Sequence, residues 1–237
     1  MYDFDVFSSD KKTLLTEIEE RLNQKEKFTI MSVNPEIILE SKKNSKIKKS
    51  LITSEINIPD GNGAILLAKK KGKKITERIA GYDLFKDLCK MSIERNEKIF
   101  LFGAEEWVVK AAAENLKREF PSIQIADYVD GFEKDWDKVV HKINKANAHY
   151  LFIAMGSPYQ ELFIEKYKDE LHINLIQPVG GSFDVVAGKV KRAPKWIQQI
   201  KLEWLYRLLA DLKRIKRISK MLVFVTNELM KREKKNE

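Results

Sequence analysis

Five short segments of the chain combine glycine with polar residues, and each follows an apolar run. They are Ser32-Val33-Asn34-Pro35, Pro59-Asp60-Gly61-Asn62-Gly63, Asp130-Gly131-Phe132, Gly156-Ser157-Pro158-Tyr159-Gln160-Glu161 and Gly180-Gly181-Ser182-Phe183-Asp184. The amides of Gly180 and Gly181 could face a phosphate, although a tight turn after a strand also needs glycine. Taken singly, Asp60 is typical of a turn, and Asn34 and Ser157 are typical of helix caps.

Other chemistries find little support in the sequence. The three histidines have no zinc-ligand spacing. Asp135 and Asp137 resemble a cation-binding carboxylate pair, but they stand where a helix is expected to begin, and the helix dipole favours acids there. Asp3 and Asp5 form a similar pair close to the terminus. The chain has no phosphate-binding P-loop, no esterase elbow and no complete dinucleotide fingerprint. We therefore expect no metal site and no cofactor.

The elements that must position these segments alternate regularly. Apolar runs at 28–33, 51–58, 98–102, 123–128, 150–155 and 173–179 predict strands. Amphipathic stretches at 35–43, 63–72, 83–95, 105–119, 133–146 and 158–170 predict helices between them. Several strands are apolar on both faces, which is typical of a parallel sheet covered by helices. The pattern indicates an α/β fold with a doubly wound, mostly parallel, Rossmann-like sheet over residues 1–195, and the five segments share its carboxyl edge.

Residues 196–237 are predicted to form a helical appendage, in the region of the chain that carries the excess positive charge. The whole chain has 44 Lys and Arg against 35 Asp and Glu, and residues 191–237 have 14 against 5. Leucines recur there at helical spacing, and Arg207, Arg214 and Arg217 fall within an arc of about 80° on the opposite side. This face is either simply solvated or a surface for phosphates or an anionic membrane.

The location of the chain is expected to be the cytoplasm. The start of the sequence does not resemble a signal peptide, and no stretch is apolar enough to span a membrane. The single cysteine, Cys89, is predicted to be buried in a helix and fits a reducing compartment.

Read in order, the segments resemble the TagA/WecG/CpsF family of bacterial glycosyltransferases. The resemblance lies in PDGNG, ERIAGYDLF, FLFGAEE, DGF, GSPYQE, VGGSFDVVAGKVKRAPKWIQ and LEWLYRLL, which together extend over nearly the whole chain. It implies transfer of N-acetylmannosamine or a related sugar from a UDP-sugar donor to an undecaprenyl-diphosphate-linked sugar. It also implies a metal-independent enzyme of cell-wall, teichoic acid or capsule synthesis at the inner face of the cell membrane.

The resemblance further implies roles for individual residues. Asp60 matches the general base of an inverting reaction, and Phe132 matches an aromatic residue that stacks on uracil. Asp184 matches a carboxylate near the ribose. The remaining positions match substrate-pocket residues or arginines that meet the lipid diphosphate: Ser32, Asn34, Arg78, Gln160, Arg207, Arg214 and Arg217.

Three positions depart from the family's pattern, and they bear on the identity of the sugar. Ala80 and Tyr82 replace the usual threonine and serine, and Tyr159 replaces a frequent lysine. A rival interpretation is a non-catalytic nucleotide-fold module whose basic tail binds nucleic acid, but the tail contains no recognised nucleic-acid module. A sugar-nucleotide epimerase would need a cofactor site, which the sequence lacks. We expect no nucleic-acid partner, and homo-oligomers are compatible with the apolar stripe.

Overall fold

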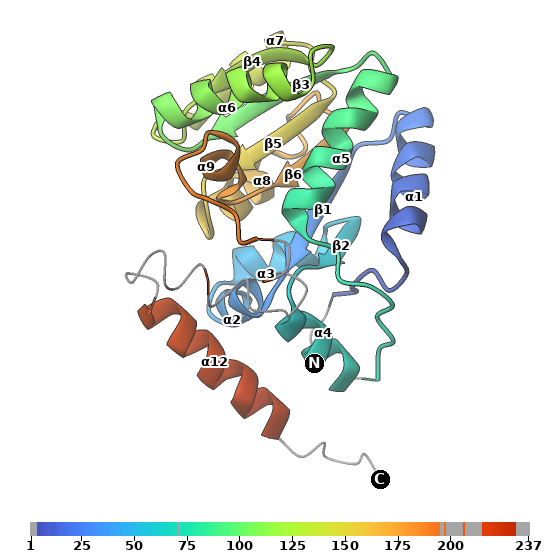
Figure 1. Ribbon diagram of the computed structural model, residues 1–237, viewed down its shortest axis with the longest axis vertical. Coiled ribbons are helices and arrows are strands. Elements are labelled where there is room, and N and C mark those ends of the chain that lie inside the picture. Colours follow the sequence, from blue (N-terminus) through green and yellow to red (C-terminus); the bar gives the residue numbers. More distant parts are fainter. Residues whose placement is uncertain (1–3, 71, 195–196, 198–205, 207–214, 231–237) are drawn as a thin grey trace.

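A computed structural model describes residues 4–70, 72–194, 197, 206 and 215–230. It shows a sheet with helices packed on both of its faces and a further helix near the C-terminus (Figure 1). The predicted α/β fold with a doubly wound sheet and a C-terminal helix is therefore confirmed.

The sheet has six strands, all parallel, in the order β2-β1-β6-β5-β3-β4. Their bounds are Phe28–Val33 (β1), Ile56–Pro59 (β2), Lys98–Gly103 (β3), Gln124–Val129 (β4), Tyr150–Ala154 (β5) and Leu175–Pro178 (β6). Most of their side chains are buried on both faces, and only the edge strand β4 is partly exposed along its whole length. This is why the strands appear in the sequence as continuous apolar runs.

One face of the sheet is covered by helices whose apolar residues recur every three or four positions. They are α1 (Lys11–Asn23), α5 (Gly81–Glu94), α6 (Glu106–Glu119) and the short α9 (Ser182–Val186). Helix α5 crosses the middle of this face, and Cys89 lies fully buried beneath it. Cys89 is thus buried in a helix, as predicted, and burial raises the pKa of its thiol, which makes it unreactive.

The other face is covered by a second set of helices. They are α2 (Pro35–Ser41), α3 (Ser45–Ile52), α4 (Asn62–Lys70), α7 (Trp136–Lys145) and α8 (Tyr159–Tyr167), followed outside them by α12 (Ile215–Met230). Helix α12 packs on α2 and α4 through the buried Phe224. Lys42 forms an ion pair with Glu228, and the Lys70 ammonium donates to the carbonyls of Glu228 and Leu229 at the end of α12.

The two edges of the sheet are covered in different ways. Along β2, the Phe7 amide donates to the Asn57 carbonyl, so the N-terminal segment runs beside that strand. On β4, the Lys142 ammonium donates to the Tyr128 carbonyl at 3.1 Å and also pairs with Asp127.

Three sequence predictions need correction. The run 51–58 is not one strand, because Leu51 and Ile52 end helix α3 and the strand begins at Ile56. Helix α1, capped by Asp10, was not predicted. Ser157 does not cap a helix, because α8 starts at Tyr159 and its N-cap is Pro158, which follows a cis peptide bond. The proposed boundary between residues 195 and 196 lies outside the described residues.

Candidate functional site

The five polar segments lie at one edge of the sheet, as their positions in the sequence predict. Because all six strands are parallel, their carboxyl ends meet along this edge, where open α/β sheets bind their ligands. The segments follow β1, β2, β4, β5 and β6. The structure brings some of their residues into contact and leaves others apart.

Ser32 and Asp60 meet at the first residue of helix α5, Gly81, and Arg78 lies beside Asp60. The Asp60 Oδ2 accepts a hydrogen bond from the Gly81 amide at 3.2 Å, and Oδ1 lies 3.9 Å from the Arg78 guanidinium. A side chain at Gly81 would place its Cβ only 2.7 Å from Ser32 Oγ. Asp60 is therefore more than a local turn residue, since it joins the loop after β2 to the start of a helix.

Gly81 is also held through its carbonyl group. The Gln177 Nε2 donates to the Gly81 carbonyl at 3.1 Å, and Gln177 is fully buried on the central strand β6. The N-cap position of α5 is Ala80, which has no side chain that can bond to the helix amides. The first turn of α5 thus takes its position from Asp60 and Gln177, which belong to other elements.

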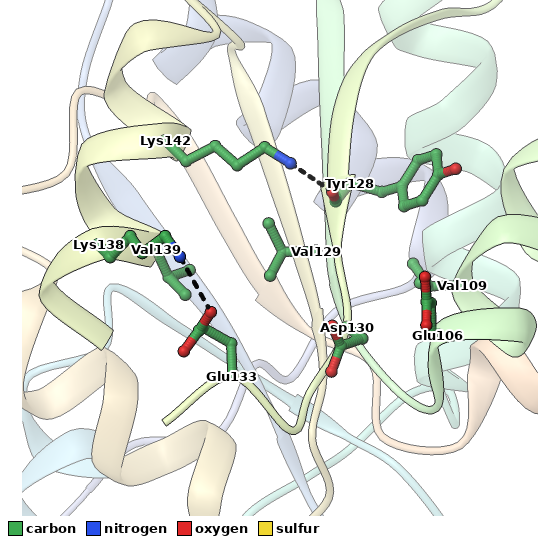
Figure 2. A pocket seen from close by; sticks show the side chains of 9 residues that line it. All are labelled: Glu106, Val109, Tyr128, Val129, Asp130, Glu133, Lys138, Val139 and Lys142. Atoms are coloured by element: carbon green, nitrogen blue, oxygen red, sulfur yellow. Dashed lines mark hydrogen bonds and ion pairs between the residues drawn. The ribbon is translucent and has the colours of Figure 1, made fainter. Parts of the chain in front are cut away.

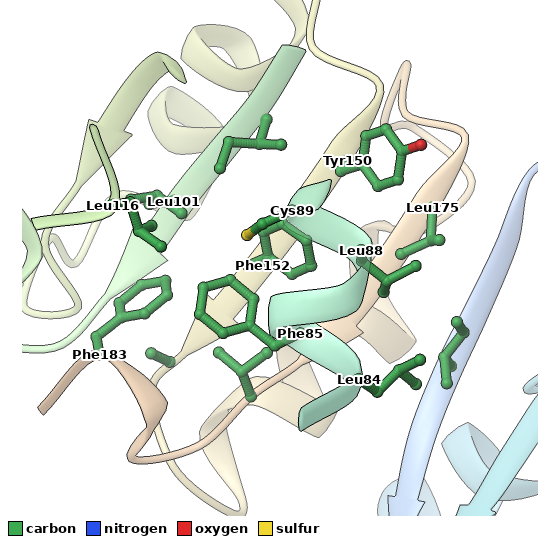
Figure 3. Close-up of a cluster of buried hydrophobic side chains, with 14 of the residues drawn as sticks. Leu84, Phe85, Leu88, Cys89, Leu101, Leu116, Tyr150, Phe152, Leu175 and Phe183 are labelled. Atoms are coloured by element: carbon green, nitrogen blue, oxygen red, sulfur yellow. The ribbon is translucent and has the colours of Figure 1, made fainter. Parts of the chain in front are cut away.

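Hydrophobic packing fixes this helix one turn further along. The Phe85 ring lies edge-on to Phe152 of β5, at 4.6 Å between centroids, and tilted against Phe183 of α9 at 6.1 Å. Figure 3 shows these rings among the buried side chains beneath α5. Close packing of this kind leaves the start of α5 little freedom to shift.

A second cluster surrounds the turn after β6. The Gln160 Oε1 accepts from the Gly180 amide at 3.2 Å, and the Ser182 amide donates to the Val179 carbonyl. Because the Gly180 and Ser182 amides are already hydrogen-bonded, this turn can offer a phosphate at most the amide of Gly181. A Cβ on Gly181 would lie 3.6 Å from Asp184, so Gln160 and Asp184 flank the turn on its two sides.

Asp184 belongs to a charged group at the rim. Lys189 lies 3.4 Å from Asp184 and 2.7 Å from Glu105. The hydrogen bond to Glu105 raises the pKa of Lys189, so this ammonium stays charged. The Trp107 indole also donates to Glu105 at 2.6 Å.

Asn34 and Phe132 occupy different surroundings. The Asn34 side chain accepts from the amides of Glu36 and Ile37, which makes it the cap of α2. Phe132 is 71% exposed, so it does not pack in the core. It follows β4, five strand spacings from β2, or roughly 24 Å across the sheet.

A cavity of about 300 Å³ lies beside β4, between α6 and α7 (Figure 2). Asp130, from the polar segment that carries Phe132, lines it together with Glu106 and Glu133. Lys138 and Lys142 lie on its α7 side, where Lys138 pairs with Glu133. With three carboxylates and two ammonium groups, the lining is strongly polar and nearly balanced in charge.

The segment that leads toward the C-terminus is attached to helix α5. Arg192 donates two hydrogen bonds to the Asp83 carboxylate, at 2.6 and 2.9 Å, and its guanidinium lies over the Tyr82 ring. Burial alone would raise the pKa of Asp83, but the hydrogen bonds from Arg192 outweigh it and keep the pKa below its usual value. Tyr82, a departure from the family's pattern, thus contacts this segment.

Helix α12 presents an unexpected apolar surface. Leu222, Val223, Leu229 and Met230 are exposed on one side of it, opposite the buried Phe224. No helix among the described residues is long and apolar enough to span a membrane. Arg207 and Arg214 lie outside the described residues, and for Arg217 only the backbone position in α12 is described.

Metal ligands do not gather anywhere in the part of the chain that the structure describes. No three side chains of histidine, cysteine, aspartate or glutamate lie close enough together there to hold an ion. Asp135 caps helix α7 by accepting from the Lys138 amide, in agreement with its predicted position at a helix start. Independence from metal stays a prediction.

Three residues of the site were not singled out from the sequence. Gly81 and Glu161 lie inside quoted stretches, AGYD and GSPYQE, where no role was assigned to them. Gln177 is a polar residue in the middle of an apolar strand, and this was the only available signal for it.

Comparison with known proteins gives a consistent result. A family model described as "Glycosyl transferase WecG/TagA/CpsF family" matches residues 1–237. A protein of Bacillus spizizenii is 38% identical over 205 residues, which cover 86% of this chain and 80% of the relative. One from Bacillus subtilis is 38% identical over 83% of this chain and 77% of its own length. One from Staphylococcus aureus is 30% identical over the same shares. All three are named N-acetylglucosaminyldiphosphoundecaprenol N-acetyl-beta-D-mannosaminyltransferase.

Proposed function

Because the chain belongs to the WecG/TagA/CpsF family of glycosyl transferases, we propose that it transfers N-acetylmannosamine from a UDP-sugar to an undecaprenyl-diphosphate-linked N-acetylglucosamine. The names of the relatives support the sugar and the acceptor. The observation that carries the proposal is the convergence of a carboxylate, a hydroxyl and a guanidinium, from Asp60, Ser32 and Arg78, at the carboxyl edge of the sheet.

The donor lies along this edge, with its uracil toward β4 and its sugar toward β2. Phe132 is exposed and offers a face for stacking on the base, and Asp184 accepts from the ribose hydroxyls. The guanidinium of Arg78, beside Asp60, attracts the diphosphate. Gly181 adds an amide at the turn between Gln160 and Asp184.

The reaction is a direct displacement at the anomeric carbon. A hydroxyl oxygen of the acceptor sugar forms the new bond as the bond from carbon to the UDP oxygen breaks, and UDP leaves with the electron pair. Asp60 takes the hydroxyl proton, since a sugar hydroxyl is a poor nucleophile without a base. Attack opposite the leaving group inverts the anomeric carbon. Arg78 and the C-terminal arginines stabilise the charge on UDP and on the lipid diphosphate without a metal ion.

The acceptor reaches the site from an anionic membrane to which the protein binds peripherally at the inner face. The exposed apolar side of α12 suits contact with the lipid surface, and the basic C-terminal segment attracts anionic headgroups. Arg207, Arg214 and Arg217 meet the lipid diphosphate, for which bidentate guanidinium contacts are well suited.

The test is a panel of UDP-sugars with a short-chain lipid-diphosphate acceptor, with the product identified by mass. UDP-N-acetylmannosamine is expected to give a disaccharide product.

Asp60→Asn keeps an acceptor for the Gly81 amide, so it should fold and bind UDP but turn over at least about 100-fold more slowly. Turnover of this variant near the wild-type rate would refute the role of Asp60 as base. Binding of RNA or DNA in gel shifts, without transfer to any acceptor, would favour the rival nucleic-acid interpretation.

A further inference from the structure

Glu161 is a buried carboxylic acid beside the second cluster. It lies in the first turn of helix α8 and is only 2% exposed. Its Oε1 accepts a hydrogen bond from Gln160 Nε2 at 2.9 Å. Its Oε2 is buried without a hydrogen-bond partner among the described residues.

The buried carboxyl group of Glu161 lowers the stability of the folded protein. Burial raises the pKa of Glu161, and the charge of Glu36 on α2 adds to this; the hydrogen bond from Gln160, the Glu161 backbone amide and the nearby Ser157 hydroxyl oppose it in part, although the Ser157 hydroxyl does not reach hydrogen-bonding geometry. The core contacts of α8 come from Phe163, Ile164 and Tyr167, which do not need a carboxylate at position 161. A costly acid at the ligand-binding edge of a sheet is more typical of function than of packing.

The hydrogen bonds around Gln160 show what the acid does. An amide side chain has one accepting end and one donating end. The Gly180 amide donates to Gln160 Oε1, so the Nε2 end must face Glu161 and needs an acceptor there. A carboxylate only accepts, and it therefore allows a single orientation of the Gln160 amide.

We propose that Glu161 is a positioning residue for sugar transfer, which fixes the orientation of the Gln160 amide and, through it, the Gly180 turn. The inference rests on the proposed function, in which Gln160 contacts the substrates. Glu161 is only 2% exposed and is therefore not placed to touch them.

The distinguishing variant is Glu161→Gln, which keeps the shape of the side chain and removes its charge. A glutamine at 161 can turn its amino group instead of its oxygen toward Gln160 Nε2, and the Gly180 amide is then the one of these two contacts that still orients Gln160. The value of kcat/KM should fall roughly 10- to 100-fold, as expected when a substrate contact is misplaced. The variant should nevertheless be more stable than the wild type.

The gain in stability has a defined pH dependence. The folded-state pKa of Glu161 lies above that of an ordinary glutamate, about 4.3. The wild type therefore loses stability as the pH rises from that value through the folded-state pKa. Since glutamine does not ionise, the difference in Tm between Glu161→Gln and the wild type should grow with pH across this window and then level off. A purely structural role predicts the opposite, a lower Tm for the variant.

Two comparisons complete the experiment. Glu165 lies on the same helix but away from the site, and it pairs with Lys49 at a distance of 2.9 Å. The control variant Glu165→Gln should therefore keep the transfer activity of the wild type. In a Gln160→Met background, Glu161→Gln should have no further effect on kcat/KM, because the residue through which it acts is gone.

The outcomes separate the two proposals. A less stable or unfolded Glu161→Gln, or full activity in this variant, would overturn the positioning role. An undiminished effect in the Gln160→Met background would overturn it as well. If the wild type transfers none of the sugars tested, the proposed function fails. The inference about Glu161 is then judged by the Tm series and by calorimetric UDP affinity, which should be weaker in Glu161→Gln.

Discussion

Replacement of Gly81 by alanine tests the geometry on which the proposed mechanism depends. Gly81 does not have a left-handed backbone conformation, so alanine can adopt its φ without strain. The new Cβ, however, would lie 2.7 Å from Ser32 Oγ and 3.4 Å from Asp60 Oδ2. The first distance is too short, and either the Ser32 side chain or the start of α5 must move.

The expected effects on stability and on activity differ in size. Crowding of this kind costs about 1–3 kcal/mol, and alanine in place of glycine returns up to about 1 kcal/mol in a helix. The net loss of about 0–3 kcal/mol should lower Tm by no more than about 12 °C for a chain of this length. A shift of Asp60 relative to its substrate by even 1 Å can cost about 100-fold in rate. We therefore expect a folded protein whose kcat/KM is about 10- to 100-fold lower.

Ser32→Ala supplies the matched control. Without the hydroxyl, the nearest neighbours of the new Cβ are Asp60 Oδ2 at 3.4 Å and Ser32 Cβ at 3.8 Å, which are tolerable contacts. In the Ser32→Ala background, Gly81→Ala should therefore reduce kcat/KM much less than it does in the wild type. Scanning fluorimetry and mass-detected transfer give both quantities. Full activity of Gly81→Ala, or an equal loss with and without the Ser32 hydroxyl, would refute the reasoning.

Three further predictions concern the independence from metal ions, the stacking of Phe132 on uracil and the binding to the membrane. Transfer should continue in excess EDTA; activity that chelation abolishes and Mg²⁺ or Mn²⁺ restores would contradict this. Phe132→Ala should weaken UDP binding by roughly 1–3 kcal/mol without loss of Tm, since the ring is exposed; an unchanged calorimetric Kd would rule out stacking. Val223→Asp and Arg214→Glu should each reduce flotation with anionic liposomes, the first by placing a charge on the 60%-exposed apolar side of α12; wild-type flotation and transfer would count against the membrane role.

The sequence predicted the sheet better than the helices around it. Strands such as Tyr150–Ala154 are buried on both faces, and a continuous apolar run between polar loops identifies them. The run 51–58 was wrongly predicted as one strand. Helix α3 ends at Ile52, only a few residues before β2 begins, and hydrophobic periodicity cannot separate a helix from a strand in so short a stretch. Helix α1 does carry a signal, with Leu14, Ile18 and Leu22 at helical spacing after the cap residue Asp10.

For the site, the sequence predicted the loops but not the contacts between them. Parallel strands bring the segments to one edge, so Asp60 and Ser32 could be expected to lie near each other. That both meet at Gly81, and that Gln177 holds the same residue from β6, depends on the packing of elements far apart in the chain. The raised pKa of Glu161 is equally hidden, because it follows chiefly from burial.

The two covered edges of the sheet bear on how this protein behaves when crowded. An open strand edge offers unpaired amides and carbonyls to any other strand, and thereby promotes aggregation. Here the segment through Phe7 occupies the edge at β2, and the Lys142 ammonium occupies the Tyr128 carbonyl at β4. On the membrane surface proposed above, the local concentration of the enzyme would be far higher than in solution. The Lys142 ammonium, which reaches β4 from helix α7, places a charge at this edge and so opposes its pairing with a strand of a neighbouring copy.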